Sequence, residues 1–351
     1  MQCEMQCELV CNSFSIDSPR IARKCELNKS ATRNEVREEN IMRQRSRVLA
    51  FFLLVAIGVA SQCAQATKLT VNCDNHEPIR TALRLLATTN PQGPNTITVS
   101  GACKGNIVIK SMDRLTLITR KGASITDRSN GTLAVVDIED SRSVTVQGFT
   151  INGGAQGILC STASVCYLTG NAIQGPGHFG VNVLRGSRAF LESNVIQNWG
   201  RGAFIDRSAE VFSSNDVFQG NGGSAIAVLN RSYFESLNSS LDNNGVGIEA
   251  GGSGVFLGGG TISGNSSDGI RVLAASEAIF SGPTITANGG VGVQVLDGSF
   301  AAFLAASITG NLSGLDVDCE PQFPMTRFVD RTGGITNCVE PTSKSQLKDL
   351  K

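Results

Sequence analysis

Histidine and proline are scarce in this chain of 351 residues, which holds two histidines and nine prolines. So few imidazoles exclude a metal site built from several histidines, and a Ser-His-Asp triad would have to use His76 or His178. Glycine is abundant at 39 residues, so the chain is rich in turns without having the proline content of a collagen.

An excess of either charge sign is also missing. Thirty lysines and arginines balance 30 aspartates and glutamates. Domains that bind nucleic acid usually carry a basic surface. We therefore expect no nucleic-acid partner.

The apolar run over residues 48–60 is too short for a permanent membrane span, which needs about 20 residues. It follows a basic segment that starts at Met42 and precedes Ala64-Gln65-Ala66, which is the order of a signal peptide and its cleavage site. We predict a signal peptide at residues 42–66 and an upstream extension outside the fold at residues 1–41. The mature chain is then exported, to a periplasmic or extracellular space, and keeps no membrane span.

The cysteines downstream of the signal peptide are even in number, and no C-x-x-C zinc or redox motif occurs among them. An even number in an exported chain predicts disulfides. Their placement favours the three local pairs Cys73–Cys103, Cys160–Cys166 and Cys319–Cys338. The alternative for Cys160 is that it fills a core position as a small apolar residue.

A short motif, glycine or alanine followed by an apolar, any and an apolar residue, recurs every 22 or 23 residues. Such a period is typical of a solenoid, in which each repeat packs on the next. The copies begin at Gly157, Gly180, Ala203, Ala225, Gly247, Gly269, Gly292 and Gly314.

Within each repeat apolar and polar residues alternate, which indicates short strands rather than helices. The motif forms the first strand. The second ends in a large apolar residue, at Leu168, Leu191, Phe212, Phe234, Leu257, Phe280 and Phe303. The third is marked by Ile173, Ile196, Phe218, Leu241, Ile262, Ile285 and Ile308. An asparagine three residues further on predicts a ladder of side-chain amides at one turn, formed by Asn221, Asn244, Asn265, Asn288 and Asn311.

These features predict an all-β fold, a parallel β-helix of 22 to 23-residue coils with a cap at each end. Leucine-rich repeats are excluded because their leucine pattern is absent, and calcium-binding nonapeptide repeats because the glycine-rich turn at residues 289–294 has no aspartate. We predict an N-terminal cap over residues 67–104 with a short amphipathic helix at 75–88. The β-helix then covers residues 105–318, and a disulfide-closed C-terminal cap and tail cover residues 319–351.

The chain resembles bacterial right-handed parallel β-helix repeat proteins of the pectin-lyase-like superfamily. The resemblance rests on the Gly-Ile/Val-x-Val columns, the asparagine turns, the capping helix and the lead-in segment at residues 95–103. It extends from residue 67 to about 318 and implies the right-handed fold. It implies little about activity, because the superfamily includes pectate and pectin lyases, polygalacturonases, other glycan-active enzymes, adhesins and members without known activity.

A clustered pair of catalytic carboxylates, which a glycoside hydrolase needs, is not evident in the sequence. A lyase would instead need an arginine or lysine base beside acidic Ca²⁺ ligands on an outward sheet face. The outward positions of the first strand are predicted to be Leu159, Asn182, Ile205, Ala227, Glu249, Arg271, Gln294 and Asp316. Glu249, Arg271 and Asp316 are the candidate catalytic residues of this hypothesis, and ordinary surface ion pairing is the alternative.

The outward positions of the second strand are unexpectedly apolar, and an exposed apolar stripe indicates that something covers it. The predicted positions are Tyr167, Phe190, Val211, Tyr233, Phe256, Ile279 and Ala302. The cover is the C-terminal segment, a second copy of the chain in a homo-oligomer, or sugar rings stacked on Tyr167, Phe190, Tyr233 and Phe256.

The leading functional hypothesis is a non-catalytic secreted module that binds a glycan or another cell-surface component. A divergent polysaccharide lyase is the first alternative, and a structural or adhesive surface protein is the second. No cofactor or resident metal is expected, with Ca²⁺ required only under the lyase hypothesis.

Overall fold

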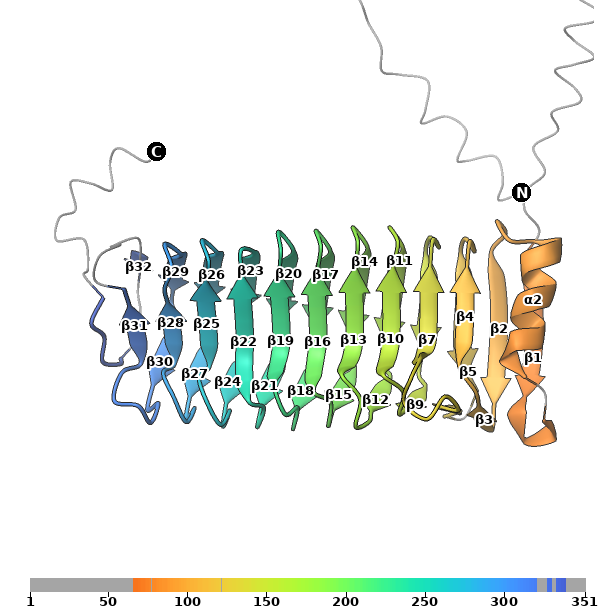
Figure 1. Cartoon of the computed structure of the whole chain (residues 1–351), viewed down its shortest axis with the longest axis horizontal. Helices are drawn as coiled ribbons and strands as arrows, with labels where there is room; N and C mark the ends of the chain where they lie inside the picture. The colour runs from red at the N-terminus through yellow and green to blue at the C-terminus, as the bar shows by residue number, and fades with distance from the viewer. Residues whose placement is uncertain (1–65, 77, 121, 321–326, 330–332, 339–351) are drawn as a thin grey trace, which may run out of the picture. The chain divides into compact units, whose positions relative to one another are not determined.

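The computed structural model describes residues 66–76, 78–120, 122–320, 327–329 and 333–338, which belong to one compact unit. Three parallel sheets, here named A, B and C, run along a solenoid (Figure 1). The predicted signal peptide and upstream extension lie outside the described residues, apart from Ala66. None of the helices in the described ranges is both long and apolar enough to cross a membrane.

Each coil contributes one strand to sheet C, then one to sheet A, then one to sheet B. Sheet A contains β1 (Thr67–Asn72), β2 (Asn95–Ser100), β5 (Leu115–Thr119), β8 (Val144–Gln147), β11 (Val165–Thr169), β14 (Arg188–Glu192), β17 (Glu210–Ser214), β20 (Tyr233–Leu237), β23 (Gly254–Gly258), β26 (Glu277–Ser281), β29 (Phe300–Leu304) and β32 (Arg327–Val329). Sheet B contains β3 (Ala102–Lys104), β6 (Ser124–Thr126), β9 (Thr150–Asn152), β12 (Ala172–Gln174), β15 (Val195–Gln197), β18 (Val217–Gln219), β21 (Ser240–Asp242), β24 (Thr261–Ser263), β27 (Thr284–Thr286) and β30 (Ser307–Thr309). Sheet C contains β4 (Ile107–Lys110), β7 (Ala134–Glu139), β10 (Gln156–Ser161), β13 (Phe179–Leu184), β16 (Arg201–Asp206), β19 (Ser224–Leu229), β22 (Val246–Gly251), β25 (Ile270–Leu273), β28 (Val293–Val295) and β31 (Val317–Cys319).

The N-terminal cap is a helix, as the sequence predicts, but a shorter one. A 3₁₀ turn, η1 (Cys73–Asn75), is followed by α2 (Ile79–Thr89), so Asn75, His76 and Pro78 lie outside the α-helix. Pro78 is the N-cap residue, in an extended conformation. Proline lacks the N–H that a helix interior needs and therefore fits only at the start of a helix. The apolar face of α2, including Leu83 and Leu86, is buried against the first coil.

The core consists of inward-facing side chains that stack in register from coil to coil. The third predicted column is confirmed, with Ile173 opposite Ile196 and Ile262 opposite Ile285. The second column is wrong in two coils, where Ser213 and Ser236 occupy the inward positions between Leu191 and Leu257. Phe212, next to Ser213, faces outward. Phe234 is buried, but it lies two residues before Ser236, at the preceding inward position of its strand.

The predicted asparagine ladder is present at the corner between sheets B and C, and its side chains are buried. The Oδ1 atom of Asn265 accepts hydrogen bonds from the backbone N–H and the Nδ2 of Asn244, at 2.9 and 3.1 Å. The ladder begins at the backbone N–H of Trp199, which donates to Asn221, and ends at Asp316. Two donors of Asn311 reach Asp316 Oδ1, at 3.0 and 2.8 Å.

Two further ladders accept the backbone N–H groups at the other two corners, and neither was predicted from the sequence. Between sheets A and B, Asn171, Asn194 and Asp216 accept the backbone N–H of the preceding coil. Between sheets C and A, serine hydroxyls do the same at Ser141, Ser164 and Ser187 and again from Ser232 to Ser299, with Ala209 at the corner between the two runs. Burial raises the pKa of Asp216, and hydrogen bonds from Ser213 and Asn194 partly oppose that rise.

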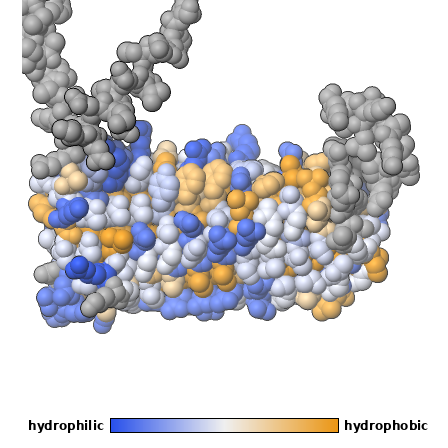
Figure 2. Space-filling view, turned by 180° about the vertical axis from the view of Figure 1, so that it is seen from behind, coloured by the Kyte–Doolittle hydropathy of each residue, from blue (hydrophilic) through white to orange (hydrophobic). Residues whose placement is uncertain are grey.

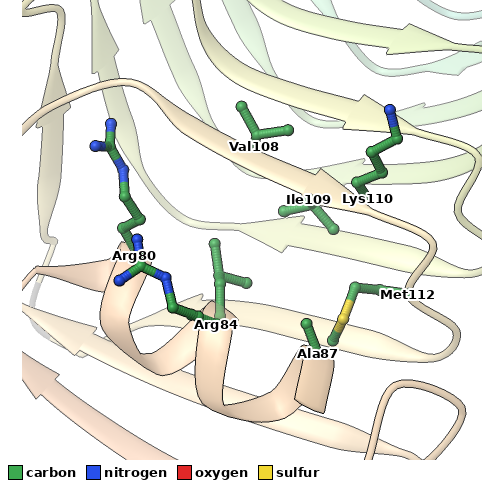
Figure 3. Close-up of a pocket in the computed structure, with 8 residues that line it drawn as sticks. Arg80, Arg84, Ala87, Val108, Ile109, Lys110 and Met112 are labelled. Carbon is green, nitrogen blue, oxygen red and sulfur yellow. The ribbon is translucent and has the colours of Figure 1, made fainter.

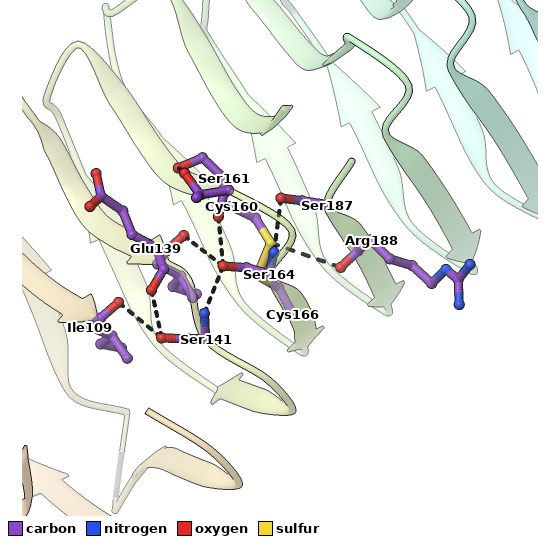
Figure 4. The surroundings of a disulfide bond; sticks show 11 residues. Ile109, Glu139, Ser141, Cys160, Ser161, Ser164, Cys166, Ser187 and Arg188 are labelled. Carbon is purple, nitrogen blue, oxygen red and sulfur yellow. Dashed lines mark hydrogen bonds between the residues drawn. A yellow bond between two sulfur atoms is a disulfide. The ribbon is translucent and has the colours of Figure 1, made fainter. Parts of the chain in front are cut away.

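The three predicted disulfides are all present: Cys73–Cys103, Cys160–Cys166 and Cys319–Cys338. Cys160–Cys166 crosses the corner from sheet C to sheet A, and the serine ladder runs beside it (Figure 4). Cys73–Cys103 ties η1 to β3, and Cys319–Cys338 closes the C-terminal end. Residues 339–351, which include the predicted tail, lie outside the described ranges.

The Asn265→Ala substitution tests the ladder. It removes the acceptor of two donors on Asn244 and leaves a buried backbone N–H unpaired, which costs about 2 to 3 kcal/mol. We expect a lower urea midpoint and a lower Tm, measured by circular dichroism. Gln219→Ala, on the exposed face of sheet B, is the control and should leave both values unchanged. Equal effects of the two substitutions would contradict the assigned role of the ladder.

Candidate functional site

The residues proposed for lyase chemistry are not assembled into one site. Glu249 and Arg271 are neighbours across β22 and β25, as predicted. Their side chains nevertheless have other partners: Glu249 accepts a 2.8 Å hydrogen bond from Ser224, and Arg271 Nε lies 2.6 Å from Asp268 Oδ2. Arg271 also donates to Ser267 Oγ at 2.8 Å.

The placement predicted for Asp316 is wrong. Asp316 is buried at the end of the asparagine ladder, and Asp318 is the residue opposite Gln294 in the outward column of sheet C. Asp318 accepts hydrogen bonds from Gln294 and Asn337. A constant offset from the repeat motif led to Asp316, 22 residues after Gln294, whereas the residue in register with Gln294 is Asp318, 24 residues after it. The same column contains Phe204, and the predicted Ile205 faces the core.

The apolar stripe on sheet A also departs from the prediction in two coils, by one residue at Phe212 and by two at Glu235. Tyr167, Phe190 and Phe212 form its first part, and Glu235 follows Phe212 in the register. Val211 faces the core. Tyr233 lies at the start of β20, with its ring centroid 6.2 Å from that of Phe212. Phe256 continues the row beyond Glu235.

The rings of this aromatic row stack on one another. The centroids of Tyr167 and Phe190 are 5.0 Å apart at an interplanar angle of 10°, and those of Phe190 and Phe212 are 5.2 Å apart at 12°. Aromatic pairs in such stacked arrangements stabilise each other. Figure 2, seen from the side opposite to Figure 1, shows hydrophobic residues among hydrophilic ones along the solenoid. The stack therefore stabilises itself, and none of the unpartnered buried polar atoms found among the described residues lies beside it.

Carboxylates lie beside this part of sheet A. Phe190, Phe212, Glu192, Glu235 and Leu237 line a shallow hollow of about 200 Å³. Burial, followed by the carboxylates of Glu235 and Glu210, raises the pKa of Tyr233. Glu210 is itself paired with Arg188, at 2.6 Å. The described C-terminal residues do not lie on the row, because β31 and β32 extend the end of the solenoid.

A second group of residues lies on the outer face of sheet C, between β7 and β16. We name it the central patch; it comprises Asp137, Gln156, Phe179, Asn182, Arg201 and Phe204. The rings of Phe179 and Phe204 stack with centroids 4.6 Å apart, and the guanidinium carbon of Arg201 lies 5.9 Å from the Phe204 centroid. Asn182 donates to Gln156 Oε1 at 3.2 Å.

The central patch contains every buried side-chain polar atom that lacks a hydrogen-bond partner within the described ranges. These atoms are Asp137 Oδ1, Asn182 Oδ1 and Arg201 Nε. Asn182 is only 3% exposed. Buried polar atoms without a partner are rare in proteins because each costs about 1 to 3 kcal/mol. Two acceptors and one donor on one sheet face thus have no hydrogen-bond partner among the described residues.

Asp137 is the titratable acid of the central patch. Burial raises its pKa to about 6 from the ordinary 3.8; Glu139 adds to the rise, and Lys110 opposes it. The carboxyl group of Asp137 therefore changes its charge near pH 6 rather than near pH 4.

Of the patch residues, only Asn182 was predicted from the sequence to lie in an outward column. Phe204 was missed because the repeat motif was aligned one residue out of register in that coil. Arg201 and Phe179 lie at the start of their strands, before the motif, where no repeat pattern marks them. A correct register would have placed Phe204 beside Asn182. No sequence signal indicates which polar atoms lack partners.

The family model of the right handed beta helix region matches residues 134–250 and 180–325, which together are more than half of the chain. The chain belongs to the right-handed β-helix family. No curated protein sequence matches it significantly.

Solved structures share the fold of this β-helix protein at low sequence identity. The Azotobacter vinelandii mannuronan C-5 epimerase AlgE4 A-module has a TM-score of 0.56 at 15% identity, over 69% of this chain and 76% of the module. The enzymatically active domain of bacteriophage CBA120 tailspike protein 2 has a TM-score of 0.54 at 12% identity, over 72% of this chain and 43% of that domain. Geobacillus virus E2 ORF18 has a TM-score of 0.56 at 12% identity, over 87% of this chain and 64% of that chain. At these identities the likeness establishes the fold alone.

The raised pKa of Asp137 predicts a pH-dependent stability. Between about pH 4 and pH 6 the folded protein holds a proton that the unfolded chain has lost, so the stability falls as the pH rises through this window. Asp137→Asn removes this loss. We expect its Tm to exceed that of the parent by about 2 to 4 °C at pH 7.5, equivalent to about 1 kcal/mol after allowing for solvent screening.

Thermal melts of the two proteins at pH 4 and pH 7.5 measure this difference, which should nearly vanish at pH 4. Asp297→Asn, at an exposed turn, is the control and should change neither value. A Tm gain for Asp137→Asn of the same size at both pH values would show that the carboxylate charge is not its cause.

Proposed function

We propose that this protein is an exported β-helix that binds a polysaccharide through the central patch of sheet C. The observation that carries the proposal is the set of three unpartnered polar atoms beside the stacked rings of Phe179 and Phe204. A sugar hydroxyl both donates and accepts hydrogen bonds, so a few hydroxyls would satisfy all three atoms. Binding sites with this composition combine apolar contact with a small number of placed polar groups.

Each residue of the patch has a distinct part in such binding. Asn182 Oδ1 and the Asp137 carboxylate accept hydrogen bonds from hydroxyl groups, and Arg201 donates to a hydroxyl or ring oxygen. The Arg201 guanidinium, held beside the Phe204 ring, is positioned by cation–π attraction. The charged form of Asp137 is the stronger acceptor, so affinity for hydroxyl groups should be higher above pH 6 than below it.

An elongated ligand fits the geometry better than a compact one. The strands β7, β10, β13 and β16 are consecutive in sheet C. Three inter-strand steps of about 4.8 Å give the patch a length of about 14 Å along the solenoid. A linear polymer lying parallel to the axis would contact all four strands, whereas a single sugar would contact only one or two of them.

Binding without turnover is favoured over catalysis for a specific reason. The carboxylate next to Asp137 is that of Glu139, which is paired with Lys110 at 3.1 Å, whereas glycoside hydrolysis uses two carboxyl groups at a defined separation as acid and as base or nucleophile. The residues of the lyase hypothesis are hydrogen-bonded elsewhere, Glu249 to Ser224 and Arg271 to Asp268. Export is supported by the three disulfides, which persist in oxidising compartments, and by the predicted signal peptide.

A matched pair of phenylalanine variants tests which face binds. The protein is first screened for retention by neutral and acidic polysaccharides in affinity gel electrophoresis, with ultraviolet absorbance recorded to detect unsaturated lyase products. For a retained polysaccharide, Phe204→Ala and Arg201→Gln should each weaken binding by about tenfold or more, since each removes a contact worth about 1.4 kcal/mol. Phe212→Ala, an outward stacked ring on sheet A, is the control and should bind like the parent.

Loss of retention in Phe212→Ala but not in Phe204→Ala would move the binding face to the aromatic row and overturn the proposal. Absorbance growth that requires Arg271 would make the protein a lyase. If no polysaccharide is retained and the protein self-associates in sedimentation, a structural or adhesive role takes precedence.

A further inference from the structure

A groove lies between the capping helix α2 and the first strand of sheet C, β4. It has a volume of about 200 Å³ and is lined by Arg80, Leu83, Arg84, Ala87, Val108, Ile109, Lys110 and Met112. Its floor is apolar, and Val108 is 55% exposed above it. Figure 3 shows the two arginines on the helix and Lys110 on the strand, around the exposed valine. We name it the cap groove.

The three cationic side chains of the cap groove differ in their ion pairs and hydrogen bonds. Lys110 lies 3.1 Å from Glu139, so its charge is largely matched. Arg80 uses one nitrogen to donate to the carbonyl of Asn106, at 2.9 Å, and keeps its other donors. The side chain of Arg84 has no ion pair or hydrogen bond with any residue in the described ranges. Two guanidinium groups, one turn apart on α2, therefore have donors available over an apolar floor.

The cap groove is continuous with the central patch. Val108 is opposite Asp137, Asp137 is opposite Leu159, and Leu159 is opposite Asn182, which is opposite Phe204. This outward column crosses four inter-strand steps, so the distance from Phe204 to the groove is about 19 Å along the solenoid. A polymer that lies on the central patch and extends toward the N-terminal cap would pass over Val108.

We infer that the cap groove binds an oxyanion substituent, a carboxylate or a sulfate, of a polysaccharide chain that lies along sheet C. The inference rests on the proposed function and adds the chemical class of the ligand. Guanidinium groups suit this role because they bind carboxylate and sulfate oxygens through paired N–H donors and stay charged at all physiological pH values. Asp137 and Glu139 lie on the patch side of the groove, so the anionic group belongs over α2 and the hydroxyl groups over β7.

Dextran, carboxymethyl dextran and dextran sulfate of matched chain length are suitable probes because they share one backbone and differ in the substituent. Their affinities for the protein are measured by biolayer interferometry at 0.15 M salt. The double variant Arg80→Gln with Arg84→Gln removes both guanidinium groups. Its control, Lys104→Gln with Arg120→Gln, removes two charges from exposed positions in β3 and next to β5, away from the groove.

We expect the parent to bind one or both anionic dextrans at least tenfold more tightly than dextran. The groove double variant should lose this preference and keep its affinity for dextran, while the control double variant keeps both. Comparison of the carboxymethyl and sulfate forms identifies which oxyanion the groove accepts.

Three results would overturn the inference: equal affinity of the parent for all three dextrans, equal losses in the groove and control variants, or no binding of either anionic dextran. Its failure is distinguishable from failure of the proposed function. If the preference for anionic dextrans depends on Arg80 and Arg84 while Phe204→Ala binds normally, the groove stands and the central patch is wrong. If Phe204→Ala loses affinity but the parent shows no preference for anionic dextrans, the central patch stands and the cap groove is wrong.

Discussion

The need to pair every backbone N–H at the corners of the solenoid controls the whole structure. A strand can pair with the strands above and below, but a corner residue turns away from them and would leave a buried donor unpaired. The side chains of the three ladders supply the missing acceptors, one coil after another. Because each acceptor lies one coil away from its donor, a ladder fixes the register of neighbouring coils. The stacking of the apolar side chains into columns depends on that register.

The repeat period made the fold and the ladder predictable from sequence, because both depend on residues that recur at a fixed spacing. The disulfides were predictable because their cysteines lie in neighbouring turns. Prediction failed where one coil departs from the average. Ser213 replaces an apolar residue in the core because its hydroxyl donates to the buried Asp216, at 2.6 Å, and such a local polar partnership leaves no periodic trace. The shifts at Phe204 and Phe212 have the same origin, since a pattern of large residues does not reveal which of two adjacent positions faces inward.

The corners of the solenoid and the outer face of sheet C differ in how completely their buried polar groups are hydrogen-bonded. At the corners, buried amides and hydroxyls are matched almost completely, and this matching gives the solenoid its stability. In the central patch, Asn182 is as deeply buried as the ladder residues, yet its carbonyl oxygen lacks a partner. An unpartnered buried oxygen lowers stability. Here it lies beside a stacked pair of rings and near Asp137, whose pKa is raised, and such a combination is typical of a binding surface. The aromatic row of sheet A differs, because none of the unpartnered buried polar atoms found among the described residues lies beside its rings.

The asparagine ladder also has a direction. Each Oδ1 accepts from the preceding coil, and each Nδ2 donates both to the Oδ1 of the following coil and to a backbone carbonyl of the preceding one. The last amide therefore needs an acceptor ahead of it that is not another asparagine. Asp316 is such a group, because a carboxylate only accepts hydrogen bonds. A coil duplicated between Asn221 and Asn311 would extend the amide pattern without a break. The ladder between sheets A and B shows the alternative: Asp216 accepts from Asn194, and its own backbone N–H donates to the hydroxyl of Ser239 in the next coil. A coil added after Asp316 would therefore need a new side-chain acceptor, such as a serine, to continue the corner.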